Sequence, residues 1–320
     1  MRKTMLTGLS LLALSIASPA SAQEITLRAV TAFAEGTQFS KPFERFIDKV
    51  NADGKGIIKI QFIGGPRAMP PFEVGNAVRT RVVDIANVTG AFYTNLMPEA
   101  DAPKLMTKPM AEQRKDGSWD YLNQIHNQKV NAYYLARQFH NVPFHIYLNK
   151  KIDKLDFSGL KIRVTPVYRD LVQALGGTPI TTPPGEVYTA LERGVVDGYG
   201  WPVSGIFDLG WDKATKFRID PGFYGAEVNV LVNLDTWKSL NDAQRKVLTE
   251  AARWLEDLDN ENVAINAAER ERQAKAGIQA LDFGPAESKK FLQRANDVAW
   301  ESVISKSPEA GKKLRALAGN

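Results

Sequence analysis

The sequence contains no cysteine and only three histidines among its 320 residues. Without cysteine the chain has no disulfide bond, no thiolate metal site and no cysteine nucleophile. The histidines His126, His140 and His145 are too few for a histidine-rich metal centre, and we expect them to be surface or hydrogen-bonded core residues. The signatures of serine hydrolases, zinc proteases and P-loop nucleotide-binding proteins are also missing. We therefore expect a protein without a metal or cofactor that is not an enzyme.

The charges are almost balanced, with 41 Lys+Arg against 36 Asp+Glu. No block of like charges and no basic stripe interleaved with aromatic residues is present, so nucleic acid is a poor candidate partner. The length exceeds the roughly 250–300 residues at which a single hydrophobic core stops growing, which indicates about two domains.

The first 22 residues have the three parts of a secretory signal peptide. A basic start, Met1-Arg2-Lys3, precedes an apolar stretch over residues 4–17 and a small-residue segment, Ser18-Pro19-Ala20-Ser21-Ala22. The apolar stretch is shorter than the ~20 residues that span a bilayer, which disfavours a membrane anchor. We predict cleavage after Ala22 and export to a bacterial periplasm. Loss of Arg2 and Lys3, without loss of an acid, lowers the formal charge from +5 to +3.

Hydrophobic periodicity predicts alternating strands and helices through the first two thirds of the chain. Strands are expected at residues 25–29, 57–63, 83–88, 132–136, 144–148, 160–164, 195–202 and 228–234. Helices are expected at residues 41–53, 72–82, 111–129, 167–175 and 183–191, and a long one from Asn241-Asp242 to about Ala274. Strands separated by single helices favour βαβ units with parallel pairing.

Two groups of residues near predicted strand ends are candidates for ligand binding. Arg163 ends an otherwise apolar strand, and ligands of open parallel sheets collect outside the carboxyl ends of the strands. Its guanidinium is a rigid fork suited to a carboxylate, although a structural salt bridge would explain it equally well. The segment Tyr199-Gly200-Trp201 also ends a strand, and its glycine permits close approach of the backbone to a ligand. Packing of Trp201 in the core is the alternative.

Three motifs together resemble one protein family. They are Gly159-Leu160-Lys161-Ile162-Arg163-Val164, then Gly176-Gly177-Thr178-Pro179, then the run from Glu186 to Gly198, EVYTALERGVVDG. This pattern is similar to that of the solute-binding proteins of TRAP (tripartite ATP-independent periplasmic) transporters, the DctP-type family. Weaker matches lie at Phe62-Ile63-Gly64-Gly65, Val83-Asp84-Ile85, Leu231-Val232-Asn233 and Trp237-Lys238-Ser239-Leu240, so the resemblance covers nearly all of the mature chain.

The resemblance implies an α/β fold of the periplasmic-binding-protein type. Each of two lobes would hold a mixed, mainly parallel sheet flanked by helices, with crossing strands and a long C-terminal helix spanning the lobes. Lobe I would comprise residues 23–142, completed by about 229–268. Lobe II would comprise residues 143–228, completed by about 269–320.

The resemblance also implies a function and a ligand-binding residue. A small organic acid would be captured between the lobes in the periplasm and handed to the small and large membrane subunits of the transporter, while the protein itself is not embedded in the membrane. The arginine that holds the ligand carboxylate in this family matches Arg163. Closure of the lobes would exclude water and strengthen the ion pair.

Further candidate ligand-binding residues come from the same alignment. Three polar pocket positions of the sialic-acid-binding branch correspond to Thr89, Phe144 and Trp201, which makes sialic acid an unsuitable ligand. Other candidates on first-lobe loops or in the strand-end segment are Phe33, Glu35, Phe92, Tyr93 and Tyr199. We expect a partly aromatic pocket for an acid with one principal carboxylate.

Two alternatives remain open at this stage. A periplasmic ligand sensor would need the same closing cleft, and the sequence does not separate it from a transport protein. A periplasmic α/β enzyme would need a nucleophile and a base in the cleft, which the scarcity of histidine disfavours.

Overall fold

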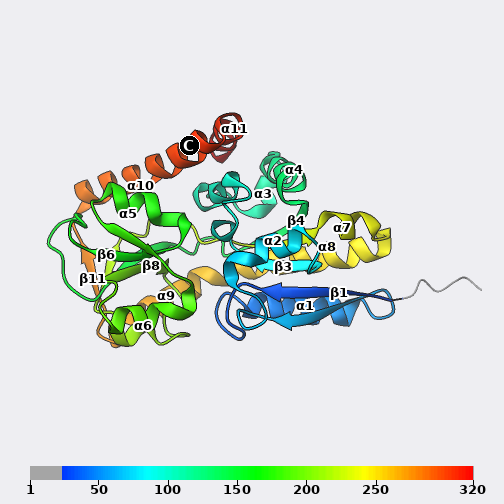
Figure 1. The fold of residues 1–320 in the computed structure, drawn as a ribbon, viewed down its shortest axis with the longest axis horizontal. Coiled ribbons are helices and arrows are strands. Elements are labelled where there is room, and N and C mark those ends of the chain that lie inside the picture. The colour runs from blue at the N-terminus through cyan, green and yellow to red at the C-terminus, as the bar shows by residue number, and fades with distance from the viewer. Residues whose placement is uncertain (1–23, 320) are drawn as a thin grey trace, which may run out of the picture.

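The computed structural model describes residues 24–319, so the predicted signal peptide lies outside the described residues. In this part of the chain the strands form two sheets, each flanked by helices (Figure 1). The strand order is β2-β1-β3-β10-β4 in the first sheet and β11-β9-β5-β8-β6-β7 in the second. The predicted two-lobed α/β architecture is confirmed.

The first sheet is mixed. Its strands are β1 (Ile25–Thr31), β2 (Ile58–Gly64), β3 (Ile85–Val88), β4 (Ala132–Gln138) and β10 (Val228–Asn233). Strand β1 pairs in parallel with β2 and β3, as the βαβ pattern predicts. Strand β10 instead runs antiparallel to both β3 and β4, because the chain enters it on its return from the second sheet.

Helices cover both faces of the first sheet. They are α1 (Lys41–Asp53), α2 (Val74–Arg79), α3 (Met110–Gln113), α4 (Ser118–Val130), α7 (Leu234–Ser239) and α8 (Asp242–Asp257). One face packs on α1 and α8, which bury Phe43, Phe46 and Leu255 in a shared apolar cluster. The single helix predicted at 111–129 is divided, because Gly117 adopts a left-handed conformation with φ 83°.

The second sheet contains three short strands that periodicity did not predict. Its strands are β5 (Phe144–Leu148), β6 (Lys161–Val164), β7 (Thr178–Thr181), β8 (Gly198–Pro202), β9 (Phe217–Asp220) and β11 (Gln279–Asp282). Strands β7, β9 and β11 were missed because they lack the apolar run that marks the equally short strands β3 and β6. The helices of this part are α5 (Arg169–Ala174), α6 (Val187–Glu192), α9 (Asn262–Lys275), α10 (Pro285–Lys306) and α11 (Pro308–Ala318).

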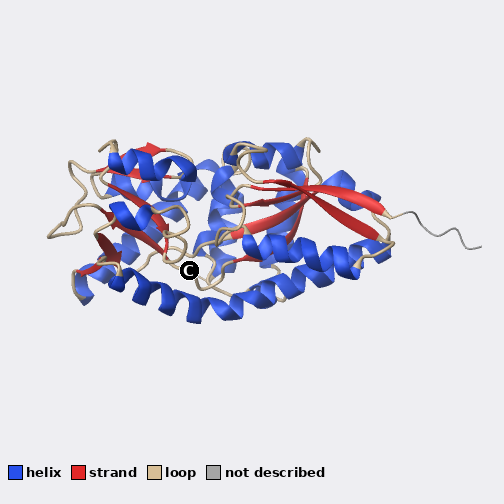
Figure 2. Cartoon of the chain, turned by 90° about the horizontal axis from the view of Figure 1, so that it is seen from below, coloured by secondary structure: helices blue, strands red, loops and turns tan. Residues whose placement is uncertain are grey.

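Helical segments join the two sheets along the length of the molecule. The long helix predicted to end near Ala274 is realised as α8 and α9, with a 3-10 turn at Leu258–Glu261 between them (Figure 2). Helix α10 packs on α5 of the second lobe and on the 3-10 helix Pro98–Leu105 of the first lobe. Helix α11 also packs on this 3-10 helix. Figure 1 shows these C-terminal helices lying across both parts of the molecule.

Three chain segments cross between the sheets and are hydrogen-bonded to one another. Residues 139–143 lead from β4 to β5, residues 221–227 lead from β9 to β10, and the third crossing is the turn between α8 and α9. The first two pair directly, since the Ala226 N–H donates to the Val142 carbonyl at 2.7 Å. The third is joined to the first by Asp259, which accepts from the N–H groups of Phe139 and His140 at 2.7 and 3.0 Å. These bonds fix the place where the lobes meet.

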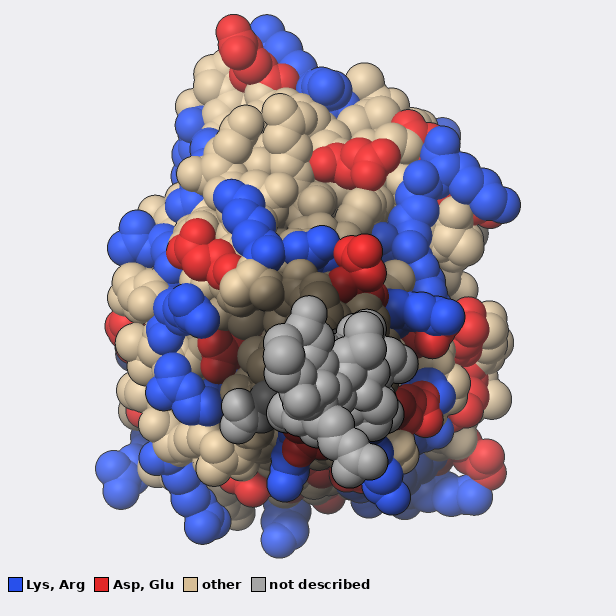
Figure 3. All heavy atoms as spheres, turned by 90° about the vertical axis from the view of Figure 1, so that its right-hand side faces the viewer, with Lys and Arg blue, Asp and Glu red and all other residues tan. Residues whose placement is uncertain are grey.

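Two features of the described part concern membranes and charge. Between residues 24 and 319, no helix is long and apolar enough to cross a membrane. On the face at the free end of the first lobe, basic and acidic side chains are interspersed (Figure 3). This mixture agrees with the near balance of charge in the sequence.

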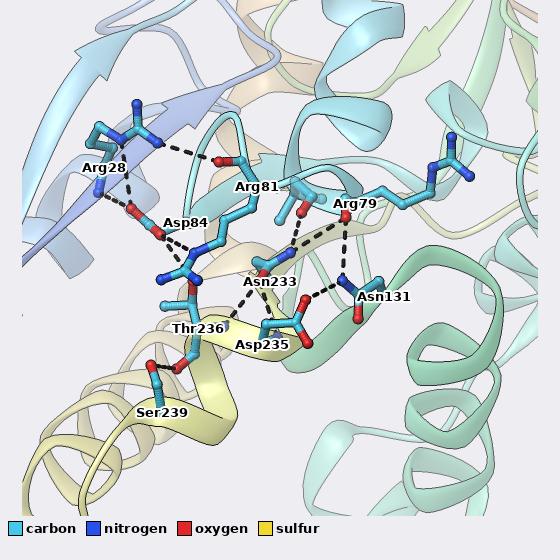
Figure 4. A network of polar contacts seen from close by, with 10 residues as sticks. Arg28, Arg79, Arg81, Asp84, Asn131, Asn233, Asp235, Thr236 and Ser239 are labelled. Carbon is cyan, nitrogen blue, oxygen red and sulfur yellow. Dashed lines mark hydrogen bonds and ion pairs between the residues drawn. The ribbon is translucent and has the colours of Figure 1, made fainter.

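A polar network attaches strand β10 and helix α7 to the rest of the first lobe (Figure 4). The buried Asn233 caps α7 by accepting from the N–H groups of Asp235 and Thr236, and its amide donates to the Val78 carbonyl at 2.9 Å. Asp84 accepts from the Arg28 N–H and from the Thr236 hydroxyl, both at 2.9 Å. The network therefore joins β1, the segment before β3 and the end of β10.

Replacing Asn233 by alanine should destabilise the protein by about 2 kcal/mol, because a helix cap and a buried hydrogen bond are lost together. Urea denaturation measures this change. The matched control is Asn95→Ala, since Asn95 is exposed and should change the free energy of unfolding by less than about 0.5 kcal/mol. Equal effects of the two substitutions would contradict the role assigned to Asn233.

Candidate functional site

A cleft of about 550 Å³ lies between the two lobes. Its first-lobe wall comes from the loops that follow β1 and β2, and its second-lobe wall comes from the loops that follow β7 and β8. Its lining residues include Phe33, Glu35, Phe39, Arg67, Glu186, Trp201 and Asp208. The cleft therefore lies at strand ends, where an open α/β sheet offers space to a ligand.

A smaller pocket of about 30 Å³ lies beside this cleft and shares the side chains of Phe33, Phe39 and Trp201 with it. We call it the inner pocket. Its other lining residues include Thr89, Phe92, Phe144, Tyr168 and Glu227. The inner pocket is mainly aromatic, and it has room for a group about the size of a water molecule.

The lobes touch across the cleft. The Gln38 N–H of the first lobe donates to Asp208 Oδ2 of the second at 2.6 Å. The ring of Phe39 meets that of Trp201 edge to face, with centroids 5.4 Å apart. A ligand that enters the inner pocket must therefore separate these contacts or be present before they form.

Arg163 is fully buried at the end of β6. Its Nε and Nη2 donate to the Thr182 carbonyl at 2.9 and 2.6 Å, and its Nη1 donates to the Tyr168 hydroxyl at 3.1 Å. No carboxylate forms an ion pair with it in the described residues, so the salt bridge weighed as an alternative is not present there. Burial lowers the pKa of the guanidinium, while the Tyr168 oxygen opposes that shift.

Two side chains of the inner pocket separate Arg163 from the empty space. Tyr168 accepts from the guanidinium and donates in turn to the Gly200 carbonyl. The guanidinium carbon lies 5.9 Å from the ring centroid of Trp201. An arginine has five N–H donors, and three hydrogen bonds are formed here, so donor capacity remains directly behind the pocket wall.

The structure brings six of the eight sequence-predicted site residues to the cleft or the inner pocket. Phe33, Glu35 and Trp201 line the cleft, and Thr89, Phe92 and Phe144 line the inner pocket. Arg163 and Tyr199 line neither. Tyr93, a further first-lobe candidate, is buried with its hydroxyl 2.9 Å from His126 Nε2.

Tyr199 lies in the core of the second lobe and not at the cleft. Its ring stacks on Tyr147 with centroids 5.1 Å apart, and its hydroxyl is 2.7 Å from Thr215 Oγ1. Tyr199 and Trp201 share one face of β8, because side chains of a strand alternate with a period of two. The ring of Trp211 packs against both, and only Trp201, nearer the strand end, reaches the cleft.

Gly200 of strand β8 packs against an aromatic ring. A Cβ atom added at Gly200 would lie 2.4 Å from the ring of Tyr168. The missing side chain therefore makes room for the tyrosine that contacts Arg163. The prediction that this glycine admits a ligand to the backbone does not describe its contacts here.

Sequence reasoning missed Glu227 in the inner pocket. This carboxyl group is 5% exposed, and burial raises its pKa to about 8. Its Oε1 accepts from the Thr89 hydroxyl at 2.6 Å and from the Gly90 N–H at 2.8 Å. The sequence did carry one signal, a single acid directly before the apolar strand β10, which the strand pattern alone did not connect to Thr89 or to a pocket.

Several buried polar atoms around the cleft have no hydrogen-bond partner among residues 24–319. They are Trp201 Nε1, Thr182 Oγ1 and Glu227 Oε2. Unsatisfied polar atoms are costly in a protein interior, and a cluster of them beside a cavity marks a place that a polar ligand can complete.

Comparison with known sequences shows the family. Residues 29–306 match the family model of bacterial extracellular solute-binding proteins, family 7. A solute-binding protein of Roseobacter denitrificans is 21% identical over 305 residues, which cover 93% of each chain. A monocarboxylate 2-oxoacid-binding periplasmic protein of Nostoc is 28% identical over 152 residues; this match covers 46% of the chain and only 40% of that relative's length.

Comparison with solved structures gives the same fold. An extracytoplasmic solute receptor of Bordetella pertussis that binds pyroglutamic acid superposes with a TM-score of 0.80 at 20% identity, over 92% of this chain and 99% of that one. A TRAP periplasmic solute-binding protein of Ralstonia eutropha with bound (S)-2-acetolactate superposes with a TM-score of 0.77 at 19% identity, over 92% and 98%. The chain belongs to family 7 of the bacterial extracellular solute-binding proteins.

Proposed function

We propose that this protein captures a small organic acid in the cleft and delivers it to the small and large membrane subunits of a TRAP transporter. Residues 1–22 would direct it to the periplasm and be removed there. The observation that carries the proposal is the buried Arg163 guanidinium, which has no carboxylate partner in the described part of the chain.

A ligand carboxylate would supply the missing counterion. Removing a guanidinium from water is costly unless an anion and hydrogen bonds replace the lost solvation. The Thr182 carbonyl and the Tyr168 hydroxyl replace part of it, and both are uncharged. Trp201 Nε1, which has no hydrogen-bond partner in residues 24–319, is a further donor beside the same pocket. A carboxylate with its two acceptor oxygens suits this pair of donors.

The arrangement of the lobes supports a mechanism of hinge closure. Arg163 is covered by Tyr168 and Trp201 while Phe39 packs on Trp201 and Gln38 is bonded to Asp208. Opening at the three crossing segments would separate these contacts and admit the acid. Closure over the acid excludes water and strengthens the ion pair. The acid favours the closed state only to the extent that it binds that state better.

The walls favour an acid whose body is small or apolar. Phe33, Phe92, Phe144 and Trp201 surround the inner pocket and would contact the part of the ligand that carries no charge. Three of the relatives named above bind 2-oxoacids, pyroglutamic acid and 2-acetolactate, which are small acids with a single carboxylate. Acids of this size are therefore the first to be tested on this protein.

Substitution of Arg163 should weaken the capture of acids. Arg163→Ala is expected to weaken binding by ~2–5 kcal/mol, which is at least about thirtyfold, because the ligand carboxylate loses its counterion. Arg163→Lys should also weaken binding, since an ammonium lacks the planar fork. Isothermal titration with pyruvate, 2-oxobutanoate and L-pyroglutamate measures the effect.

The control for this experiment is Arg193→Ala, which removes an exposed arginine of the same lobe and should leave binding unchanged. A ligand at 100 times its Kd should also stabilise the wild type by ~2.7 kcal/mol against unfolding. Wild-type affinity in Arg163→Ala, or the absence of binding for a wide panel of carboxylates, would refute the proposed function.

Tyr168 should position Arg163 without contributing charge. Tyr168→Phe keeps the ring beside Gly200 and removes the hydroxyl that joins the guanidinium to the Gly200 carbonyl. We expect acid binding to weaken roughly tenfold, as for the loss of a hydrogen bond to a charged group. Tyr188→Phe, which removes an exposed hydroxyl bonded to Glu192, is the matched control and should bind normally. Equal titration curves for the two variants would show that the Tyr168 hydroxyl is not needed.

A further inference from the structure

Glu227 is a second buried ionisable group at the cleft, and it comes from a different part of the chain than Arg163. It lies in the crossing segment that leads into β10, in contact with the first-lobe residues Thr89 and Gly90. The Thr89 hydroxyl and the Gly90 N–H both donate to Oε1 of Glu227. The other oxygen, Oε2, is buried and without a hydrogen-bond partner in residues 24–319, and no lysine or arginine there forms an ion pair with it.

The surroundings of Glu227 favour its uncharged form at neutral pH. Burial is the main cause of its raised pKa of about 8; the bonds from Thr89 and Gly90 and the charge of Arg137 on β4 oppose the shift, and Asp101 adds to it. The nearby titratable groups Tyr93 and Tyr134 have pKa values raised by their own burial and are uncharged as well. Since Oε1 already accepts two hydrogen bonds, the proton of a neutral carboxyl belongs on Oε2, where it is available to an acceptor.

Glu227 is also distinctive among the residues that line the inner pocket. Of the described residues there, it is the one with an ionisable carboxyl, and most of the others are aromatic or aliphatic. The pocket holds about 30 Å³, against about 550 Å³ for the adjoining cleft. The inner pocket therefore has room for only one small group of a bound acid, and Glu227 forms part of its wall.

We propose that Glu227 determines the specificity of the site: it selects carboxylic acids that carry an uncharged hydrogen-bond acceptor, such as a keto, hydroxyl or lactam oxygen, for the inner pocket. The inference rests on the proposed function, since Arg163 would bind the carboxylate of the acid and Glu227 would form a hydrogen bond with its substituent. A site with a buried polar group rejects an analogue that leaves this group unpaired much more strongly than an apolar pocket rejects a change in size.

The test compares acids of matched shape. L-Pyroglutamate is set against cyclopentanecarboxylate, which lacks the lactam, and against L-proline, which carries an ammonium in the same ring. Pyruvate is set against propanoate in the same way. Isothermal titration at pH 7 should show that the wild type prefers the acceptor-bearing member of each pair by about tenfold or more.

Variants separate the role of Glu227 from that of Arg163. Glu227→Leu should reduce the preference within each pair to less than about threefold, whereas Arg163→Ala should weaken both members and preserve their ratio. Glu301→Leu, which alters an exposed glutamate on α10, should behave as the wild type. The thermal unfolding midpoint of each variant reports whether it is folded.

A pH series provides a second reading that does not depend on the leucine variant. The neutral carboxyl donates below its pKa, so wild-type affinity for L-pyroglutamate should fall as the pH rises through about 8. Glu227→Gln keeps the shape and the donor, so it should retain the preference and show a flat profile between about pH 6 and 9.

The outcomes distinguish the two proposals. Equal affinities within both pairs, or an unchanged ratio in Glu227→Leu, would overturn the role of Glu227 and leave acid capture by Arg163 intact. A wild-type preference for L-proline that is lost in Glu227→Gln would also overturn it, because it would show an ionised carboxylate paired with an ammonium. Failure of every acid to bind the wild type would refute the proposed function and this inference with it.

Discussion

The buried guanidinium of Arg163 is the constraint around which the second lobe is arranged at the cleft. Its fork is satisfied by the Thr182 carbonyl on one side and by the Tyr168 hydroxyl on the other. Tyr168 fits only because Gly200 of the neighbouring strand has no side chain. The ends of β6, β7 and β8 are thus arranged around the guanidinium of Arg163. The surrounding protein groups replace only part of the water that solvated this cation. The remaining solvation is what a ligand carboxylate would provide.

The same cation explains why a nearly neutral protein could collect anions. A formal charge of +3 spread over residues 23–320 gives only a weak field, and salt screens exposed charges beyond about 10 Å. The charge of Arg163 lies behind aromatic side chains, in surroundings of low dielectric constant. Its interaction with a nearby anion is much stronger there than in water. Placement, more than net charge, would account for binding.

The cleft itself is a product of the three crossing segments. Asp259 between the long helices accepts from the backbone of residues 139–140, and residues 142 and 226 pair beside it. Phe144 and Glu227 are the residues that directly follow or end these crossings, and both line the inner pocket. A movement that opens the lobes would therefore turn about the segments that also carry pocket residues, which couples the shape of the pocket to closure.

The sequence by itself determined the main features that are local or carried by contiguous motifs. Periodicity predicted β1 and α1, because apolar residues recur along one face of each. The run from Glu186 to Gly198, together with the strand that ends at Arg163, indicated the family. Only the tertiary structure decided which side chains meet. Tyr199 and Trp201 have the same alternation, yet Tyr199 is enclosed in the core by Tyr147 and Thr215, while Trp201 reaches the cleft. Glu227 precedes a strand whose pattern predicts burial, but its contacts with Thr89 and Gly90 join residues more than 130 positions apart. Periodicity shows which face of a helix or strand is apolar. The residues that pack against that face depend on how the chain crosses between the two lobes.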